Sequence, residues 1–210
     1  MIGQYIPGGA GEGYENTMKA YHQAVTLGAG MLELDVHLSK DGEVVVAHDQ
    51  HLLRLTGVDK NIRDLNYNQL PRLKEKLNID FRPGEFYCDT TVMPEQRVFA
   101  RFEDVLKTFP DTQINIDVKV GDEGLVEAVN RIIVDNDAEK RCVWGSFNKD
   151  TTERCYQTNP NIGLIFSMAR VLRLYVLFYL GLLSFVSIKE THLELPLPSI
   201  FYDEKYRSGE

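Results

Sequence analysis

Residues able to bind a cation are concentrated in the stretch 31–49. Glu33, Asp35 and His37 stand at alternate positions, so in a β-strand their side chains share one face and the intervening leucine and valine residues take the other. Two carboxylates held side by side repel each other unless a cation or a proton lies between them. Oxygen ligands beside an imidazole suit a hard divalent ion. A solvated acidic edge strand is the alternative interpretation of this stretch by itself.

A second strand pattern repeats the arrangement at residues 114–120. Asn115, Asp117 and Lys119 alternate there with isoleucine and valine, which places a third carboxylate and an ammonium group on one polar face. One such strand is typical of a solvated surface. Two of them favour a common site on which both polar faces converge.

The dipeptide His48-Asp49 follows an almost wholly apolar run at residues 43–47, of the kind found in strands buried on both faces. Asp41-Gly42, before this run, is a hairpin turn signal. We therefore expect His48 at the C-terminal end of a strand that directly follows the acidic one.

A glycine-rich turn at residues 8–11 leads through Glu15 into a helical pattern. Asn16 or Thr17 is a natural N-cap for this helix, and Gly28 is well placed to end it. The glycines alone are a weak indication of phosphate binding, because a tight turn needs them equally.

Together these motifs resemble the glycerophosphodiester phosphodiesterase family. The matching segments are GGAGEGYENT (8–17), ELD (33–35), HD (48–49) and NIDVK (115–119). The resemblance extends over residues 5–200. The closer match is to the membrane-associated animal branch of the family, which acts as lysophospholipase D. The segments VWG (143–145) and YLGLLSFVSI (179–188) are also similar to members of this branch.

The resemblance implies an α/β fold, a TIM-type (β/α)8 barrel, with a divalent metal, Mg²⁺ or Ca²⁺, as cofactor. The implied metal ligands are Glu33, Asp35, His48 and Asp117. His48 and Lys119 are the implied catalytic residues, with His48 as general acid and Lys119 as a phosphate contact. Glu15 and Lys119 are assigned to substrate binding. Asp49 is expected to orient His48 or to cap the loop, and not to bind the metal. His37 and His51 match no functional position.

The implied reaction is metal-dependent hydrolysis of lysophospholipids or glycerophosphodiesters. A lysophospholipid would yield lysophosphatidic acid and an alcohol such as choline. The metal and Lys119 would neutralise the charge that builds on the phosphate during attack, and His48 would protonate the departing alcohol.

The sequence departs from the family at two places. The family carries His-Arg immediately before Gly-Gly, as acid/base and phosphate clamp, whereas this chain has Ile6-Pro7. About six of the eight barrel strands are expected, at residues 3–6, 31–38, 43–47, 113–120, 142–147 and 162–167. Two interpretations remain open: a truncated form of a full enzyme, or a catalytically impaired relative that binds metal and phospholipid without turnover.

Composition limits the remaining possibilities. The 210 residues suit one domain, here 1–200 with a polar tail at 201–210. A net charge of −8 without a basic cluster excludes nucleic acid as an expected partner. Three cysteines without metal-type spacing fit a reducing, cytosol-facing environment. Residues 81–96 are expected to form a long loop over the active face.

The segment 171–188 is predicted to associate with a membrane. Residues 174–188 carry no charge, and as a helix they would reach about 22 Å, short of the roughly 30 Å hydrocarbon core. We therefore expect an interfacial or re-entrant helix, with a spanning helix as the alternative. The expected location is the cytoplasmic face of a membrane, with the endoplasmic reticulum as the candidate organelle.

Overall fold

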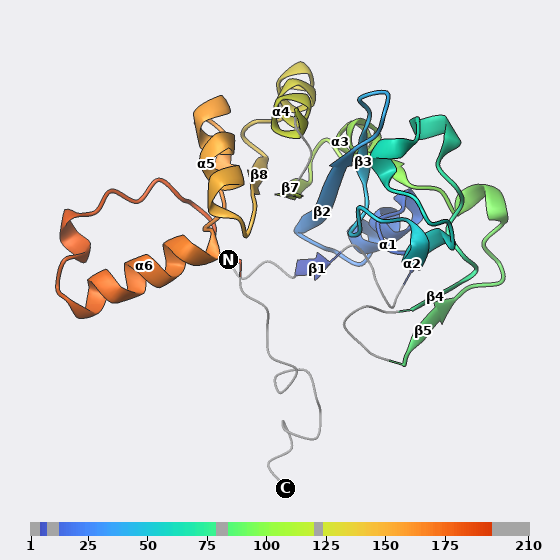
Figure 1. Ribbon diagram of the computed structural model, residues 1–210, viewed down its shortest axis with the longest axis horizontal. Coiled ribbons are helices and arrows are strands. Elements are labelled where there is room, and N and C mark those ends of the chain that lie inside the picture. The colour runs from blue at the N-terminus through green and yellow to red at the C-terminus, as the bar shows by residue number, and fades with distance from the viewer. Residues whose placement is uncertain (1–4, 8–12, 79–83, 120–123, 195–210) are drawn as a thin grey trace, which may run out of the picture.

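The computed structural model describes residues 5–7, 13–78, 84–119 and 124–194, and for residues 5–7 it describes the backbone alone (Figure 1). The strands are β1 Tyr5–Pro7, β2 Met31–Leu38, β3 Val44–Val46, β4 Lys76–Asn78, β5 Phe86–Cys88, β6 Ala100–Arg101, β7 Gln113–Val118, β8 Cys142–Gly145 and β9 Gly163–Leu164. The α-helices are α1 Met18–Thr26, α2 Leu53–Thr56, α3 Phe102–Thr108, α4 Leu125–Asp135, α5 Lys149–Thr158 and α6 Met168–Tyr179. The 3-10 helices are η1 Ile62–Asp64, η2 Tyr67–Gln69, η3 Pro94–Gln96 and η4 Leu183–Phe185.

Five strands form a parallel succession in the order β1, β2, β7, β8 and β9. Helix α1 connects β1 to β2, α4 connects β7 to β8, and α5 connects β8 to β9. A parallel bridge between Ile165 and His192 extends the series. Figure 1 shows α3, α4 and α5 along one side of this sheet. Parallel strands joined by helices in sequential order are the arrangement of a (β/α)8 barrel, of which the described residues form a part.

Strand alternation separates the core from the polar face as the sequence predicts. Leu34 of β2 and Ile116 of β7 are fully buried in one apolar cluster, which also includes residues of α3 and α4. The side chains of Glu33, Asp35 and Asp117 alternate with them and therefore take the opposite face. Burial of the apolar face against the helices thus fixes where the acidic side chains point.

Replacing Leu34 by alanine should lower the free energy of unfolding by about 2–5 kcal/mol, because a buried leucine leaves a cavity that a packed core fills only partly. Urea denaturation monitored by circular dichroism measures the change. Leu27→Ala is the control, since Leu27 is 63% exposed and its loss should cost less than about 0.5 kcal/mol. Equal effects of the two substitutions would contradict this assignment of the core.

One predicted barrel strand runs in the opposite direction. Residues 43–47 do contain β3, but β3 is antiparallel to β2, with Val46 opposite Val36. The cause is the turn at residues 39–43, where Gly42 has a φ of 81° and the chain reverses at once. A parallel neighbour would need a crossover of a dozen or more residues. Strand β3 therefore forms a hairpin with β2 and is not one of the parallel barrel strands.

The prediction of one long loop at residues 81–96 is also wrong in part. Strand β5 pairs with β4 in a two-stranded antiparallel sheet, and η3 follows it, while residues 81–83 lie outside the described part. A second apolar cluster supports this region, with Leu52, Leu55 and Phe99 among its members. These elements form a small lobe between β3 and β6.

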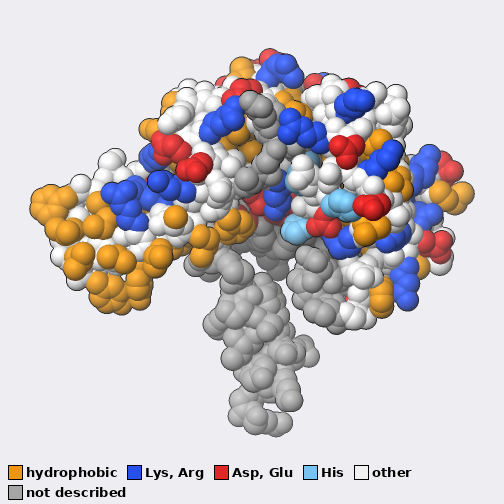
Figure 2. Space-filling model, in the orientation of Figure 1, with side chains coloured by type: hydrophobic (Ala, Val, Ile, Leu, Met, Phe, Trp, Pro, Cys, Tyr) orange, Lys and Arg blue, Asp and Glu red, His pale blue; other side chains and the backbone are white. Residues whose placement is uncertain are grey.

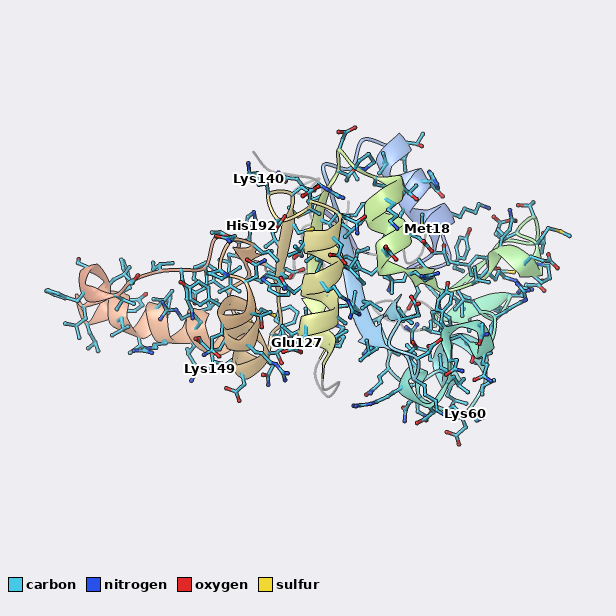
Figure 3. The ribbon with its side chains drawn as sticks, turned by 90° about the horizontal axis from the view of Figure 1, so that it is seen from above. Met18, Lys60, Glu127, Lys140, Lys149 and His192 are labelled. Atoms are coloured by element: carbon cyan, nitrogen blue, oxygen red, sulfur yellow. The ribbon has the colours of Figure 1, made fainter. Side chains whose placement is uncertain are left out.

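The helix predicted over residues 174–188 begins and ends earlier than expected. Helix α6 begins after the N-cap Ser167, whose side chain accepts from the backbone N–H of Arg170, and it ends at Tyr179. Gly181 has a φ of 68°, outside the helical region, and η4 follows. Figure 3 shows α6 extending beyond α5, whose first residue Lys149 is labelled. Within the described residues, no helix combines the length and apolar character needed to cross a membrane. The predicted tail at 201–210 lies outside those residues.

Candidate active site

The polar faces of β2 and β7 meet as neighbours in the sheet. Parallel pairing places Asp35 opposite Asp117 and Glu33 opposite Asn115. All four side chains are at least nine-tenths buried. The structure therefore brings together the three carboxylates that the sequence analysis singles out on these strands.

Lys119 completes this cluster from the residue after β7. Its Nζ atom lies 2.7 Å from Oδ1 of Asp35 and 2.7 Å from Oδ2 of Asp117. Burial alone would lower the pKa of Lys119, but the two carboxylates outweigh it and hold that pKa above its ordinary value. The ammonium group is thus a fixed positive charge between two acidic side chains.

The remaining acidic charge is poorly compensated. Burial, and then the nearby Asp35, Glu194 and Asp117, raises the pKa of Glu33 well above its ordinary value. Burial also raises the pKa of Asp117, although Lys119 opposes the effect. The Oδ1 atom of Asp117 is buried and has no hydrogen-bond partner. Such a cluster favours a proton or an additional cation among its oxygens.

His48 lies just beyond β3 and is about half exposed. Its Nδ1 atom lies 2.9 Å from Oδ1 of Asp49, and this hydrogen bond raises the pKa of His48. Burial would raise the pKa of Asp49, but hydrogen bonds from His48 and Arg54 together lower it to about 2. Asp49 makes the contact with His48 that was expected of it. With Nδ1 engaged, Nε2 is the nitrogen available to other groups.

The sequence matches a known protein family over most of its length. The profile of the glycerophosphoryl diester phosphodiesterase family matches residues 3–196. The chain belongs to this family. The predicted resemblance is therefore confirmed, and its match covers most of the sequence.

Relatives of this phosphodiesterase-family chain include human "Lysophospholipase D GDPD1", which is 44% identical over 193 residues, covering 92% of this chain and 60% of that protein. Mouse "Lysophospholipase D GDPD3" is 36% identical over 193 residues, covering 92% of this chain and 57% of that protein. The chain therefore spans about three fifths of the length of these relatives.

Solved structures of the same family support the fold. The glycerophosphoryl diester phosphodiesterase domain of a Mycobacterium tuberculosis protein matches with a TM-score of 0.67 at 22% identity, covering 84% of this chain and 63% of that one. The Thermotoga maritima glycerophosphodiester phosphodiesterase matches with a TM-score of 0.57 at 24% identity, covering 83% and 67% respectively. The predicted α/β fold of incomplete TIM-barrel type is confirmed by these matches and by the strand order.

The candidate site of this phosphodiesterase-family chain contains the oxygen donors that a hard cation prefers. The carboxylates of Glu33, Asp35 and Asp117 are oxygen donors, and the Oδ1 atom of Asp117 lacks a partner. In their present positions, however, no three His, Cys, Asp or Glu side chains of the described residues are grouped as a metal centre. Lys119 lies between Asp35 and Asp117, so a bound cation would require its side chain to move.

Sequence reasoning missed Arg54, which lies in the one-turn helix α2. Its guanidinium group donates to both carboxylate oxygens of Glu15, at 2.5 and 3.2 Å, and its Nε atom donates to Asp49. The sequence gives only a weak signal, an arginine five residues after the His-Asp pair. Glu15, predicted to bind substrate, thus lies beside Arg54 in the structure.

Sequence reasoning also missed two polar contacts at the edge of the acidic cluster. Thr17 is the N-cap of α1, whereas Asn16 points its Nδ2 atom at Oδ2 of Asp35, 3.5 Å away. Glu194 accepts a hydrogen bond from Nδ2 of Asn115 at 3.2 Å, which brings a fourth carboxylate to the cluster. The residues after 188 show no periodic pattern that could have indicated this placement.

The two histidines without an assigned role contact other parts of the chain. His37 is buried, and its Nε2 atom lies 3.3 Å from the backbone oxygen of His48. His51 is exposed and pairs with Asp59 at 3.1 Å. His37 therefore supports the backbone at His48, and His51 belongs to the surface of the lobe.

Lys119→Met should lower the free energy of unfolding by about 1–3 kcal/mol, because two buried carboxylates lose their shared cation. Thermal unfolding measures this loss. The control is Lys107→Met, which removes an exposed lysine that pairs with Glu103 and should change stability by less than about 0.5 kcal/mol. We further expect millimolar Ca²⁺ or Mg²⁺ to recover more stability in Lys119→Met than in the unchanged protein. A variant as stable as the control contradicts the role given to Lys119.

Proposed function

We propose that this chain is a divalent-metal-dependent phosphodiesterase that acts on lysophospholipids or glycerophosphodiesters. With a lysophospholipid it would give lysophosphatidic acid and an alcohol such as choline. The observation that carries the proposal is the buried group of carboxylates on β2 and β7 with Lys119 between two of them. The name of the human and mouse relatives, lysophospholipase D, supports this choice of substrate.

Each side chain has a part that follows from its chemistry. Glu33, Asp35 and Asp117, with His48 beside them, would hold Mg²⁺ or Ca²⁺, and members of this family generally depend on a divalent metal. When bound, the metal supplies Lewis-acid polarisation of a phosphoryl oxygen. Lys119 contacts a non-bridging oxygen and neutralises the charge that develops there.

Bond cleavage needs both a proton donor and a proton acceptor. The oxygen of water forms the new bond to phosphorus as the bond to the alcohol oxygen breaks, and His48 gives its Nε2 proton to that departing oxygen. The proton released by water requires a base. The position that the family resemblance gives to this base is Ile6, which cannot accept a proton.

The second candidate function follows from this same position. A chain with Ile6-Pro7 in place of His-Arg and an intact group of carboxylates is suited to bind a metal and a phospholipid without turnover. Cation and phospholipid binding without alcohol release is the result that distinguishes this candidate from the first.

Choline release from lysophosphatidylcholine tests the first candidate. We expect release that EDTA stops and that added Mg²⁺ or Ca²⁺ restores. The paired substitution Glu33→Ala with Asp35→Ala should remove the activity, whereas Glu103→Ala with Asp104→Ala, which removes two acidic residues from the outer helix α3, should retain it. Unchanged release after loss of Glu33 and Asp35 overturns the site assignment.

We also propose that α6 and η4 attach the domain to the cytoplasmic face of a membrane, with the endoplasmic reticulum as the candidate organelle. None of the α6 residues is buried, and Phe178 and Phe185 are 61% and 84% exposed. Figure 2 shows hydrophobic side chains gathered over this projecting segment. Exposed aromatic and aliphatic side chains of this kind suit insertion at a membrane interface.

Sedimentation with phosphatidylcholine vesicles tests membrane attachment. Phe178→Ser with Phe185→Ser should release most of the protein from the vesicles. Phe86→Ser, at an exposed phenylalanine in β5, is the control and should leave binding unchanged. Equal vesicle binding by all three proteins overturns the proposed attachment surface.

A further inference from the structure

Arg54 links the proton donor to a buried carboxylate elsewhere in the chain. We propose that Arg54, anchored by Glu15, is a positioning residue that fixes Asp49 and through it the orientation and tautomer of His48. This inference rests on the proposed phosphodiesterase function, in which His48 protonates the departing alcohol. Neither Arg54 nor Glu15 needs to touch substrate for the arrangement to work.

The contacts form a continuous chain of hydrogen bonds. Both oxygens of Glu15 accept from the two terminal nitrogens of Arg54, which is the paired geometry that a planar guanidinium group favours. The Nε atom of Arg54 donates to Oδ2 of Asp49. The other oxygen of Asp49 lies 2.9 Å from Nδ1 of His48. Each oxygen of Asp49 thus has its own partner, and the carboxylate plane is held from both sides.

Differences in burial make Glu15 the anchor of this chain of contacts. The side chain of Glu15 is 7% exposed, that of Arg54 is 20% exposed and that of His48 is 47% exposed. Glu15 also precedes Asn16, which points at Asp35 in the acidic cluster. Two consecutive residues, 15 and 16, therefore contact the residue that holds Asp49 and a carboxylate of β2, respectively. We accordingly assign Glu15 a role through Arg54 in place of direct substrate contact.

The arrangement has a direct consequence for proton transfer. A carboxylate fixed against Nδ1 keeps a proton on that nitrogen, so that neutral His48 presents Nε2 as an acceptor and protonated His48 presents it as a donor. Lysine could not replace Arg54, because a single ammonium group lacks the fork that reaches Glu15 and Asp49 together. The geometry thus requires arginine and not merely a positive charge.

Nitrogen NMR of the ¹⁵N-histidine-labelled chain tests the inference without relying on activity. The spectra are recorded at a pH where His48 is neutral, and the His48→Gln spectrum assigns its signals. We expect the unchanged protein to carry the proton on Nδ1 and Arg54→Met to shift most of it to Nε2. Arg154→Met is the matched control, because Arg154 forms a similar pair with Glu127 at 3.0 and 2.9 Å, on the exposed surfaces of α5 and α4. Its His48 signals should not change.

Kinetics on lysophosphatidylcholine provide the second readout. Arg54→Met and Asp49→Asn should each lower kcat by about 10- to 100-fold with little change in KM, since loss of a partner that orients a reacting group typically has this effect. Arg54→Lys should recover only a small part of the loss. A KM increase at constant kcat would show direct substrate binding and would overturn the positioning role.

Other outcomes are equally decisive. A folded Arg54→Met protein whose His48 proton stays on Nδ1 overturns the inference. If Arg54→Met fails to fold by circular dichroism, Glu15→Gln replaces it, and unchanged His48 signals in that variant overturn the inference in the same way. A shift of the His48 signals in a protein that releases no choline supports the positioning role and counts against the hydrolytic function alone.

Discussion

Glu33→Gln should reduce choline release by more than about 100-fold and raise the free energy of unfolding of the metal-free protein by about 1 kcal/mol. Burial and the neighbouring Asp35, Glu194 and Asp117 raise the pKa of Glu33, so the folded chain holds that proton more tightly than the unfolded chain. Ionised Glu33 therefore opposes folding. An uncharged amide of the same shape removes this cost, and it also removes one of the proposed metal ligands.

The raised pKa of Glu33 determines the pH at which Glu33→Gln should increase stability. The folded-state pKa of Glu33 is raised, so proton binding by Glu33 stabilises the folded chain. This contribution to the free energy of unfolding is complete below the unfolded pKa near 4.5 and is lost as pH rises through the folded-state pKa. Urea denaturation at pH 4 and pH 8 should therefore show the gain from Glu33→Gln at the higher pH. Calorimetric titration with Mg²⁺ and Ca²⁺ measures the loss of binding.

Glu95→Gln is the control for Glu33→Gln, because Glu95 lies exposed in η3. It should change stability by less than about 0.5 kcal/mol at either pH and leave choline release unchanged. A Glu33→Gln protein that is less stable at pH 8, or that keeps its activity, would contradict the assignment of Glu33 to a strained cation site.

Ile6→His with Pro7→Arg should raise turnover by about 10²- to 10⁴-fold, the usual contribution of one well-placed acid/base group. Strand β1 pairs in parallel with β2, and Pro7 lies opposite Glu33 in the register. The register thus places position 7 next to Glu33 of the acidic cluster. The resemblance places the second acid/base and the phosphate clamp of the family at these two positions. An arginine there adds a charge-assisted contact to phosphate oxygens.

Ile6→Asn with Pro7→Gln separates this effect from a general gain in polarity. The control introduces polar groups of moderate size without a titratable or charged side chain, and its turnover should stay near the starting value. Steady-state choline release measures both variants. Unchanged turnover in the His-Arg variant would contradict the prediction and support the binding function without catalysis. An equal gain in turnover in both variants would contradict the acid/base role assigned to position 6.

The sequence predicts the acidic part of the site well because its signals are local. Alternation along 31–38 and 113–118 assigns each side chain to a face, and parallel pairing then places Asp35 beside Asp117. Contacts between distant segments leave no such pattern. Arg54 reaches Glu15 across 39 positions, and Asn115 reaches Glu194 across 79. Those residues become recognisable only when the fold brings the segments together.

Two predictions about elements failed for physical reasons that are visible in single residues. The sequence places residues 43–47 among the barrel strands, but the tight turn at Asp41-Gly42 before them can only produce an antiparallel neighbour. Apolar composition predicted helix up to Ile188. The backbone of Gly181 adopts a positive φ, however, and helix α6 ends two residues before it. Composition reports burial preference and does not determine where a helix stops.

The hairpin of β2 and β3 sets the spacing between His48, the proposed proton donor, and the carboxylates of β2. The backbone N–H of Ala47 donates to the backbone oxygen of Asp35 at 2.9 Å, one residue before His48. The same residue that contacts Lys119 through its side chain thus fixes the start of the His48 segment through its backbone. Extending or shortening the turn at residues 39–43 would slide His48 along β2 while Asp35 stays in register with Asp117. Changing the length of this turn is therefore a way to alter the distance between His48 and the carboxylates of β2.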